Sequence, residues 1–153
     1  MKALEHNSPF IQIINWNNPP EKYLVRFSCR SLIWLKESNQ PSYSNRHELQ
    51  IYLHKDYPRT PPQLMWMTNI FHPNILPPEQ NGGVCVGSWS PSETLAKLCL
   101  RIAEMLQYKN YSIEDVLNKK AADWAEKNRS SFPVDDRPLI VSDERAGIRN
   151  IDG

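Results

Sequence analysis

The stretch formed by residues 70–91 limits the fold most, because most of it cannot be regular secondary structure. Pro73, Pro77 and Pro78 lack backbone donors, and Gly82 and Gly83 weaken any helix or strand that would include them. Clear strand patterns occur before this stretch and helical patterns after it. This order predicts an α+β domain in which helices pack on an antiparallel meander sheet.

Alternating apolar residues predict the strands. Residues 23–35 place Tyr23, Val25 and Phe27 on one face of a single half-buried strand. Residues 47–54 and 63–68 alternate in the same way, and residues 9–14 are a weaker extended segment. The polar residues 36–46 are expected to form a long hairpin loop.

Two helices are expected downstream. The sequence Ser90-Pro91-Ser92-Glu93 matches a capping box with proline at the first helical position, so a helix is predicted to start there. Its apolar stripe consists of Leu95, Leu98, Cys99, Ile102 and Leu106. A second helix is expected to begin at Ser112 or Asn118 and to end near Asn128, with Leu117, Ala121 and Trp124 as its apolar stripe.

Length and charge narrow the function classes. A chain of 153 residues fits one domain, expected over residues 1–131, followed by a polar tail over residues 132–153. The net charge of +1 does not favour nucleic acid as a partner. No apolar run is long enough for a membrane span, and the first residues contain no signal-peptide core, so a cytoplasmic location without a membrane partner is expected.

Cysteine and histidine spacing gives no sign of a metal or cofactor. The three cysteines are Cys29, Cys85 and Cys99, an odd number without a Cys-x-x-Cys pair, and the four histidines form no close pair. A disulfide scaffold, a zinc site and a bound cofactor are therefore not expected.

Five sequence pieces, taken together and in order, resemble the core signature of ubiquitin-conjugating enzymes. They are the run Tyr57-Pro58-Arg59-Thr60-Pro61-Pro62, a short strand, His72-Pro73-Asn74, Cys85, and Trp89-Ser90-Pro91. The resemblance covers about residues 23–128 and implies the fold of that family, the UBC-like fold. The segment with Leu117, Ala121 and Trp124 is most similar to bacterial relatives, which implies a divergent bacterial member.

The resemblance implies that Cys85 carries a ubiquitin-like modifier as a thioester. An activating enzyme would supply the modifier, and the lysine amine of an acceptor protein would receive it. The residues alone leave open whether Cys85, in a segment rich in Gly and Pro, is an accessible nucleophile or a packed thiol beside Val84 and Val86. Cys29 and Cys99 belong to apolar faces and are expected to be core thiols.

Other roles follow from the resemblance as well. Asn74 would either donate a hydrogen bond to the oxyanion of the tetrahedral intermediate or hold the active-site loop. His72, Pro73 and Trp89 would be structural residues of that loop, and the isomer of the bond before Pro73 is left open. Ser112 and Glu114 lie where the family often places a gate residue that orients the attacking amine. The alternative is that Ser112 only caps a helix, with Asp115 three residues later.

The sequence departs from the family pattern around the cysteine. Asn74 and Cys85 are 11 positions apart, more than is usual, and residues 76–80 look like the insertion. Cys85 and Trp89 are four positions apart, fewer than is usual. The loops on both sides of the cysteine are therefore expected to follow different paths. Only residues 1–5 could supply part of the N-terminal helix, and Arg59 replaces the aromatic residue typical of members that bind ring-type ligases, so the use of a ligase is left open.

Two other functions are compatible with parts of the pattern. One is an inactive module with the same fold that only binds a ubiquitin-like partner, although such members lack the acceptor cysteine. The other is a cysteine hydrolase in which His72 or His54 activates Cys85. Neighbouring genes for a modifier, an activating enzyme and a peptidase would indicate a bacterial conjugation pathway with a role in antiviral defence.

Overall fold

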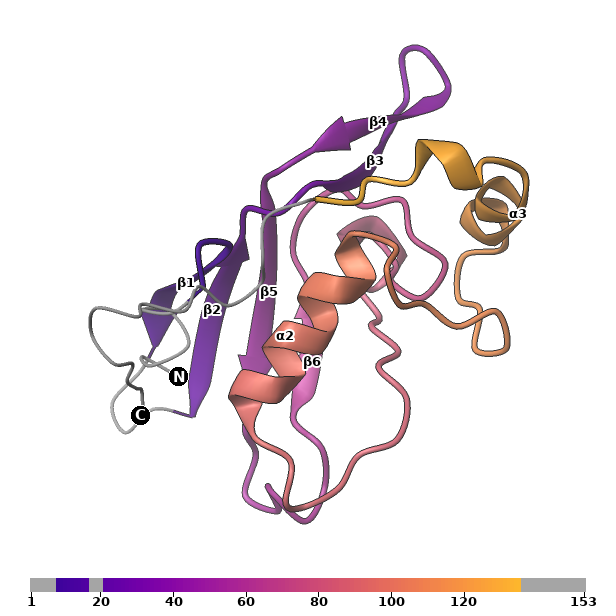
Figure 1. Ribbon diagram of the computed structural model, residues 1–153. Helices are drawn as coiled ribbons and strands as arrows, with labels where there is room; N and C mark the ends of the chain where they lie inside the picture. Colours follow the sequence, from indigo (N-terminus) through magenta and orange to yellow (C-terminus); the bar gives the residue numbers. More distant parts are fainter. Residues whose placement is uncertain (1–7, 17–20, 136–153) are drawn as a thin grey trace, which may run out of the picture.

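The computed structural model describes residues 8–16 and 21–135, which form a four-stranded sheet, a two-stranded sheet and two α-helices (Figure 1). The large sheet is antiparallel throughout, in the order β1-β2-β5-β6. Its strands are β1 (Ile11–Trp16), β2 (Lys22–Phe27), β5 (His47–Tyr52) and β6 (Gln63–Trp66). The small sheet pairs β3 (Ser31–Leu35) with β4 (Gln40–Ser44). The predicted α+β class is confirmed.

The main core lies between the large sheet and the helix α2 (Leu95–Leu106), which runs across the sheet in Figure 1. Register places Val25 of β2 opposite Leu49 of β5, and Leu49 opposite Trp66 of β6, and all three are fully buried. On α2, the buried residues Leu98, Cys99, Ile102 and Leu106 have helical spacing, as the sequence predicts. Burial of both apolar faces against each other therefore holds α2 on the sheet.

A second, aromatic cluster joins the small sheet to the helix α3 (Lys119–Lys127). Its buried members are Leu32, Phe71, Tyr108, Ala121 and Ala125, and Trp34, Tyr111, Trp124 and Phe132 pack against them. The hydroxyl of buried Tyr108 donates to the carbonyl of Phe71. This cluster fixes the end of α2 and the segment that follows it.

The single strand expected over residues 23–35 is wrong, because the chain turns at residues 28–30. β2 ends at Phe27 and β3 begins at Ser31, in a different sheet. The burial pattern changes at this turn: Ser31 and Leu32 are both buried, which breaks the alternation.

The long loop expected over residues 36–46 is also wrong, since it contains β4. β4 pairs with β3 alone, and Pro41 occupies this edge strand, where the ladder does not need every N–H group. The β4 sequence Gln-Pro-Ser-Tyr-Ser has few apolar residues, so no alternating apolar pattern indicates a strand there.

The predicted start of the first helix at Ser90 is wrong. α2 begins after Thr94, whose hydroxyl accepts a hydrogen bond from the backbone N–H of Lys97 at 3.1 Å. The residues of the expected capping box instead form a separate turn, in which Glu93 N–H donates to the Ser90 carbonyl at 2.9 Å. The Glu93 carboxylate is engaged by Arg101 and does not reach back to the backbone.

The second predicted helix is confirmed as α3, with the later of the two expected starts. Asn118 caps it, since its side chain accepts from Ala121 N–H at 3.0 Å. Leu117 precedes the helix and is largely exposed, so it is not part of an apolar stripe. The short 3-10 helix η2 (Arg129–Ser131) follows, and Pro133 and Asp135 are buried beyond it. The tail expected from residue 132 lies, from residue 136 on, outside the described residues, and its boundary stays a prediction.

None of the helices in residues 8–16 and 21–135 is both long and apolar enough to cross a membrane.

Candidate functional site

Cys85 is positioned by a narrow antiparallel ladder that folds residues 74–85 back on themselves. Ile75 forms a β-bridge with Val84, and Leu76 N–H donates to the Gly83 carbonyl at 2.8 Å. At the end of this ladder, Cys85 N–H donates to the Asn74 carbonyl at 2.9 Å. The backbones of Asn74 and Cys85 are therefore in direct contact despite the 11 positions between them.

The tip of the ladder is the short 3-10 helix η1 (Pro78–Gln80), which includes part of the insertion expected at residues 76–80. Gly82 closes the tip with φ of 65°, in the left-handed region that glycine adopts without strain. A Cβ atom on Gly82 would lie 2.7 Å from the carbonyl oxygen of Trp66, so the site also requires glycine for lack of space. Trp66 N–H donates to the Gly82 carbonyl at 2.8 Å, which joins this tip to β6.

The Asn74 side chain is buried and connects the ladder to residues 112–115. Its Nδ2 group donates to the carbonyls of Ser112 and Asp115, both at 3.0 Å, and its Oδ1 atom accepts from Ser112 N–H at 2.8 Å. An asparagine amide has two N–H donors, and both are used here. In this conformation the geometry matches the loop-holding role, and no Asn74 hydrogen remains for an oxyanion.

His72 and Pro73 connect the same ladder to α2 and to the start of α3. Nε2 of buried His72 donates to the Met105 carbonyl at 2.6 Å, and Nδ1 accepts from Asn74 N–H at 3.0 Å. Burial lowers the pKa of His72 to about 4, against the smaller opposing effect of the Met105 carbonyl. The carbonyl of Pro73 accepts from Leu117 and Asn118 N–H, and the cis peptide bond of the described chain precedes Pro58 instead.

A small pocket of about 120 Å³ lies beside Cys85. Cys85 is half-buried, and it shares this pocket with Asn74, Arg101, Ser112 and Asp115. Arg101 and Asp115 are the charged residues among those that line it. The pocket thus combines an accessible thiol with one cation and one carboxylate.

The two gate candidates lie differently. Ser112 lines the pocket, and its hydroxyl accepts from the backbone N–H groups of Glu114 and Asp115 at 3.1 and 3.0 Å. This is the cap-like contact that the alternative interpretation expected, although no helix follows it. Glu114 and Asp115 are both exposed, but Asp115 lines the pocket and Glu114 does not. The sequence indicates Asp115 only as a partner of the Ser112 cap, because nothing in the local sequence distinguishes it from Glu114 as a gate residue.

Trp89 closes the segment after the cysteine. Its indole Nε1 donates to the Pro58 carbonyl at 2.9 Å, and its ring lies 6.0 Å from that of Tyr57. This contact joins the run of residues 57–62 to the turn before α2.

The other two cysteines are buried in the main core. Cys29 and Cys99 are fully buried, and burial raises the pKa of Cys99 to about 12. A thiol with such a pKa is not a nucleophile at neutral pH. Their predicted role as core thiols is consistent with this burial.

Neither histidine proposed as a base for a hydrolase lines the Cys85 pocket. His72 faces Met105, and His54 contacts Thr60 Oγ1 at 3.0 Å and Asp56 N–H at 3.3 Å. Among the described residues, therefore, no imidazole lies in the pocket as a base for Cys85. In residues 8–16 and 21–135, no group of three or more His, Cys, Asp or Glu side chains could hold a metal ion.

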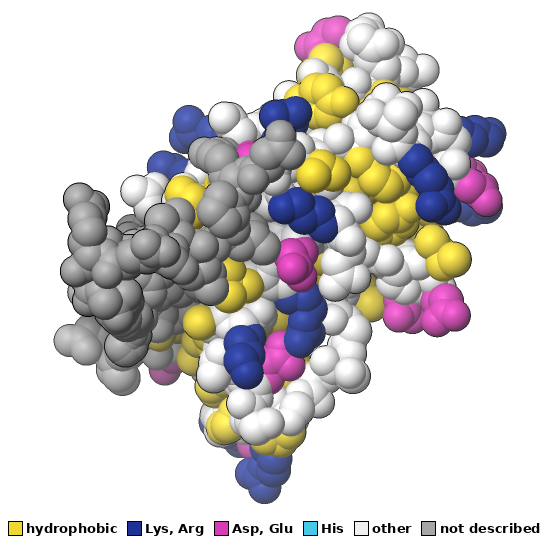
Figure 2. Space-filling model, in the orientation of Figure 1, with side chains coloured by type: hydrophobic (Ala, Val, Ile, Leu, Met, Phe, Trp, Pro, Cys, Tyr) yellow, Lys and Arg dark blue, Asp and Glu magenta, His cyan; other side chains and the backbone are white. Residues whose placement is uncertain are grey.

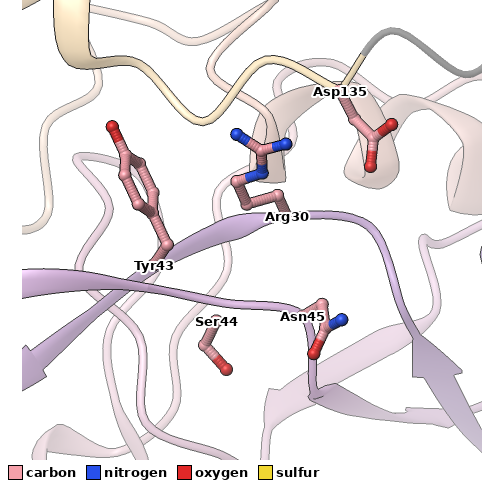
Figure 3. A pocket seen from close by; sticks show the side chains of 5 residues that line it. All are labelled: Arg30, Tyr43, Ser44, Asn45 and Asp135. Carbon is pink, nitrogen blue, oxygen red and sulfur yellow. The ribbon is translucent and has the colours of Figure 1, made fainter.

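A larger cavity of about 560 Å³ lies away from this site, between β4 and the segment near Asp135 (Figure 3). Arg30 lies between Tyr43 and Asp135 in this view, and Ser44 and Asn45 lie below them (Figure 3). The Tyr43 hydroxyl donates to the Ser131 carbonyl at 2.7 Å. None of the five described residues that line this cavity is a cysteine or a histidine.

Comparison with known proteins points to one family. A family model described as ubiquitin-conjugating enzyme matches residues 31–135. Ubiquitin-conjugating enzyme E2 16 of Schizosaccharomyces pombe is 40% identical over 78 residues, which cover 48% of this chain and 46% of the relative. Ubiquitin-conjugating enzyme E2 S of Drosophila willistoni is 27% identical over 117 residues, 69% of this chain and 54% of the relative. The chain spans about half the length of these curated relatives.

A solved structure shares the fold. The E2 domain of a Toxoplasma gondii ubiquitin conjugating enzyme superposes with a TM-score of 0.52 at 24% identity, and covers 78% of this chain and 77% of that chain. The overall fold is thus found in a protein of low sequence identity.

Proposed function

Because the chain belongs to the ubiquitin-conjugating enzyme family, we propose that it accepts a ubiquitin-like protein as a thioester on Cys85 and transfers it to an amine. The observation that carries this proposal is the contrast among the cysteines. Cys85 opens into a pocket with a carboxylate and a cation, whereas Cys29 and Cys99 are fully buried. The same contrast does not favour an inactive binding module, which has no need of an accessible thiol.

The first half-reaction is a thioester exchange. The Cys85 thiolate attacks the carbonyl carbon of the modifier's C-terminal thioester on the activating enzyme, and a new C–S bond forms. The bond to the donor sulfur then breaks, and the donor leaves as a thiolate. No cofactor enters this step, and the modifier stays activated.

The second half-reaction is aminolysis. The nitrogen of a lysine side chain attacks the same carbonyl, a C–N bond forms, and Cys85 leaves as a thiolate. The amine must lose a proton, and the carboxylate of Asp115 lines the pocket where this proton is released. We assign Asp115 as the gate residue, with Ser112 fixing its backbone and Glu114 outside the pocket.

Asn74 supports both half-reactions by position. Its three side-chain hydrogen bonds hold residues 112–115 against the ladder that carries Cys85. The Asn74 amide therefore holds the backbone of Asp115 close to Cys85, so that both residues line the same pocket. His72 and Pro73 hold the opposite side of the ladder through Met105 and Leu117.

The proposed partners are an activating enzyme, a ubiquitin-like modifier and a lysine-bearing acceptor. Ubiquitin is the modifier to test first, since the names of the relatives refer to it. Use of a ligase, the cytoplasmic location and the bacterial source with a role in defence stay predictions. The N-terminal helix considered from the sequence lies outside the described residues.

Replacement of Cys85 by serine tests the acceptor. With ubiquitin, ATP and ubiquitin-activating enzyme, the unchanged chain should form an adduct that a reducing agent removes on a gel. Cys85→Ser should lose this thioester and can form a longer-lived oxyester instead, because an alkoxide is the poorer leaving group. Cys29→Ser and Cys99→Ser should keep the thioester and lose only stability, since each buries a hydroxyl. An equally reducible adduct on Cys85→Ser would contradict the assignment.

The same assay tests Asp115. Asp115→Asn should charge normally and should discharge to free lysine about 10- to 100-fold more slowly, because the amide cannot accept the amine proton. Glu114→Gln is the matched control, since it removes a neighbouring carboxylate that does not line the pocket. Equal slowing by both substitutions would show a general charge effect and would rule out the gate.

A further inference from the structure

Arg101 has contacts that the proposed reaction has not yet explained. It lies in the middle of α2, and it lines the Cys85 pocket. Positive and negative side chains are interspersed over the surface of α2 in Figure 2, so no large positive patch accounts for it. The contacts of Arg101 itself are more informative.

The Arg101 guanidinium holds two acceptors. Nη1 donates to the carbonyl oxygen of Val86 at 3.1 Å, and Nη2 donates to the Glu93 carboxylate. Both side chains of this ion pair are largely buried, with 27% exposure for Arg101 and 11% for Glu93. A planar guanidinium can satisfy two acceptors in fixed directions, which an ammonium group cannot do.

The segment that Arg101 contacts has little other support. Gly87 and Ser88 are exposed, and Gly87 has φ of 86° with open space around its Cα. In residues 21–135, no other hydrogen bond reaches the backbone of residues 86–88. The Val86 side chain packs against the main core, and its carbonyl is held by Arg101. Arg101 thus donates the one hydrogen bond that the backbone of residues 86–88 receives within residues 21–135.

We propose that Arg101 is a positioning residue for the thioester reaction, oriented by Glu93 and acting through the Val86 carbonyl. This inference rests on the proposed function of Cys85. By fixing the residue that follows Cys85, Arg101 sets the direction of Sγ toward the pocket and toward Asp115. Small displacements of a reacting group cost rate steeply, up to about 100-fold for about 1 Å.

The test separates the Val86 contact from the ion pair. Cys85 is charged directly from ubiquitin that carries a C-terminal mercaptoethanesulfonate thioester, and discharge to free lysine is then followed in a single turnover. Arg101→Gln loses both contacts. The exchange of charges in Arg101→Glu with Glu93→Arg keeps an ion pair between the two positions and loses the contact to Val86. Lys97→Gln removes an exposed cation on the same helix and is the matched control.

The expected result is a separation of rate from stability. Arg101→Gln should discharge about 10-fold more slowly or worse, and it should also melt at a lower temperature, because it leaves the largely buried Glu93 carboxylate without its partner. The exchanged pair should melt close to the unchanged protein and should stay slow. Arg101→Lys keeps a donor for one of the two acceptors, so its discharge should be faster than that of Arg101→Gln and slower than that of the unchanged protein. Lys97→Gln should discharge at the unchanged rate.

Two results would overturn the inference while the proposed function stands. The first is discharge of Arg101→Gln at the unchanged rate, and the second is recovery of the rate by the exchanged pair. Failure of the unchanged protein to charge on Cys85 would instead overturn the proposed function, and the inference with it.

Discussion

The two sides of Cys85 are held in different ways. Before the cysteine, backbone hydrogen bonds connect residues 74–85 to each other and to β6, and most of residues 70–77 are buried. After it, residues 87 and 88 are exposed, and the Arg101 side chain provides the hydrogen bond to the Val86 carbonyl. The upstream side should therefore be sensitive where backbone geometry is special or where a buried side chain is replaced, and the backbone of the downstream side should depend on the hydrogen bond from Arg101.

The largest expected effect is at Gly82, on the upstream side. Gly82→Ala places a Cβ atom against the carbonyl oxygen of Trp66, at a backbone φ of 65°. Neither residue can move away without breaking the hydrogen bond from Trp66 N–H to the Gly82 carbonyl. We expect a loss of about 3 kcal/mol in the free energy of unfolding, from backbone strain and steric overlap together. Urea denaturation measures it.

Gly87→Ala is the matched control on the downstream side. It has a similar positive φ of 86°, but no atom lies within 4 Å of its added Cβ. Its cost should be limited to backbone strain, about 1 kcal/mol. Equal costs at Gly82 and Gly87 would contradict the contrast between the two sides.

The next effect concerns Asn74, which connects the upstream side to the gate. Asn74→Ala removes three hydrogen bonds and leaves two carbonyls without their donor, at a cost of about 2 kcal/mol. Because the amide holds residues 112–115, we expect a lower melting temperature together with slower charging and slower discharge. Asn110→Ala, at an exposed asparagine of the same pocket, should melt normally.

The outcome for Asn74 also separates the two roles that the sequence left open. A normal melting temperature with slow discharge alone would indicate an oxyanion donor, since such a donor acts only when negative charge develops. Normal melting with normal charging and discharge would rule out both roles.

An effect of similar size, which appears only at low pH, is expected from His72. Its pKa is about 4 in the folded protein because of burial, and that of an unfolded histidine is about 6.5. Between these two pH values the unfolded chain binds more protons than the folded protein. The contribution of His72 to the free energy of unfolding is therefore fully present above pH 6.5 and is lost as the pH decreases toward 4. At pH 5 the loss from this group should be about 2 kcal/mol.

Urea denaturation at pH 7.5 and pH 5.0 measures this loss, and His72→Gln should reduce the difference between the two. Buried His47 also has a lowered pKa, so some pH dependence should remain in the variant. An unchanged difference in His72→Gln would show that His72 is not responsible.

The sequence predicted the elements whose apolar pattern is continuous. β5, the face of α2 and the burial of Cys29 and Cys99 all follow from spacing, because each buries one face against the same core. It failed where tertiary contacts decide, as in the turn at residues 28–30 and in β4, whose neighbours are distant in the sequence or polar.

The site was predictable only in part for the same reason. The ordered motif identified Cys85 and Asn74 as candidates, but it could not show that the Asn74 amide is fully used by residues 112–115. Arg101 lies in α2 and Asp115 lies in the segment before α3, so no short sequence motif identifies them as residues of the same pocket. In the sequence, only the spacing of four positions from Cys85 to Trp89 indicates that the segment after the cysteine follows a different path.

Mass spectrometry of the charged protein tests the central claim most directly. The chain is incubated with ubiquitin, ATP and ubiquitin-activating enzyme, quenched at low pH, measured intact, and then digested to locate the adduct. We expect one ubiquitin on the peptide that contains Cys85, and we expect a reducing agent to remove it completely. An adduct on Cys29 or Cys99, or no adduct while the activating enzyme itself is charged, would contradict this expectation.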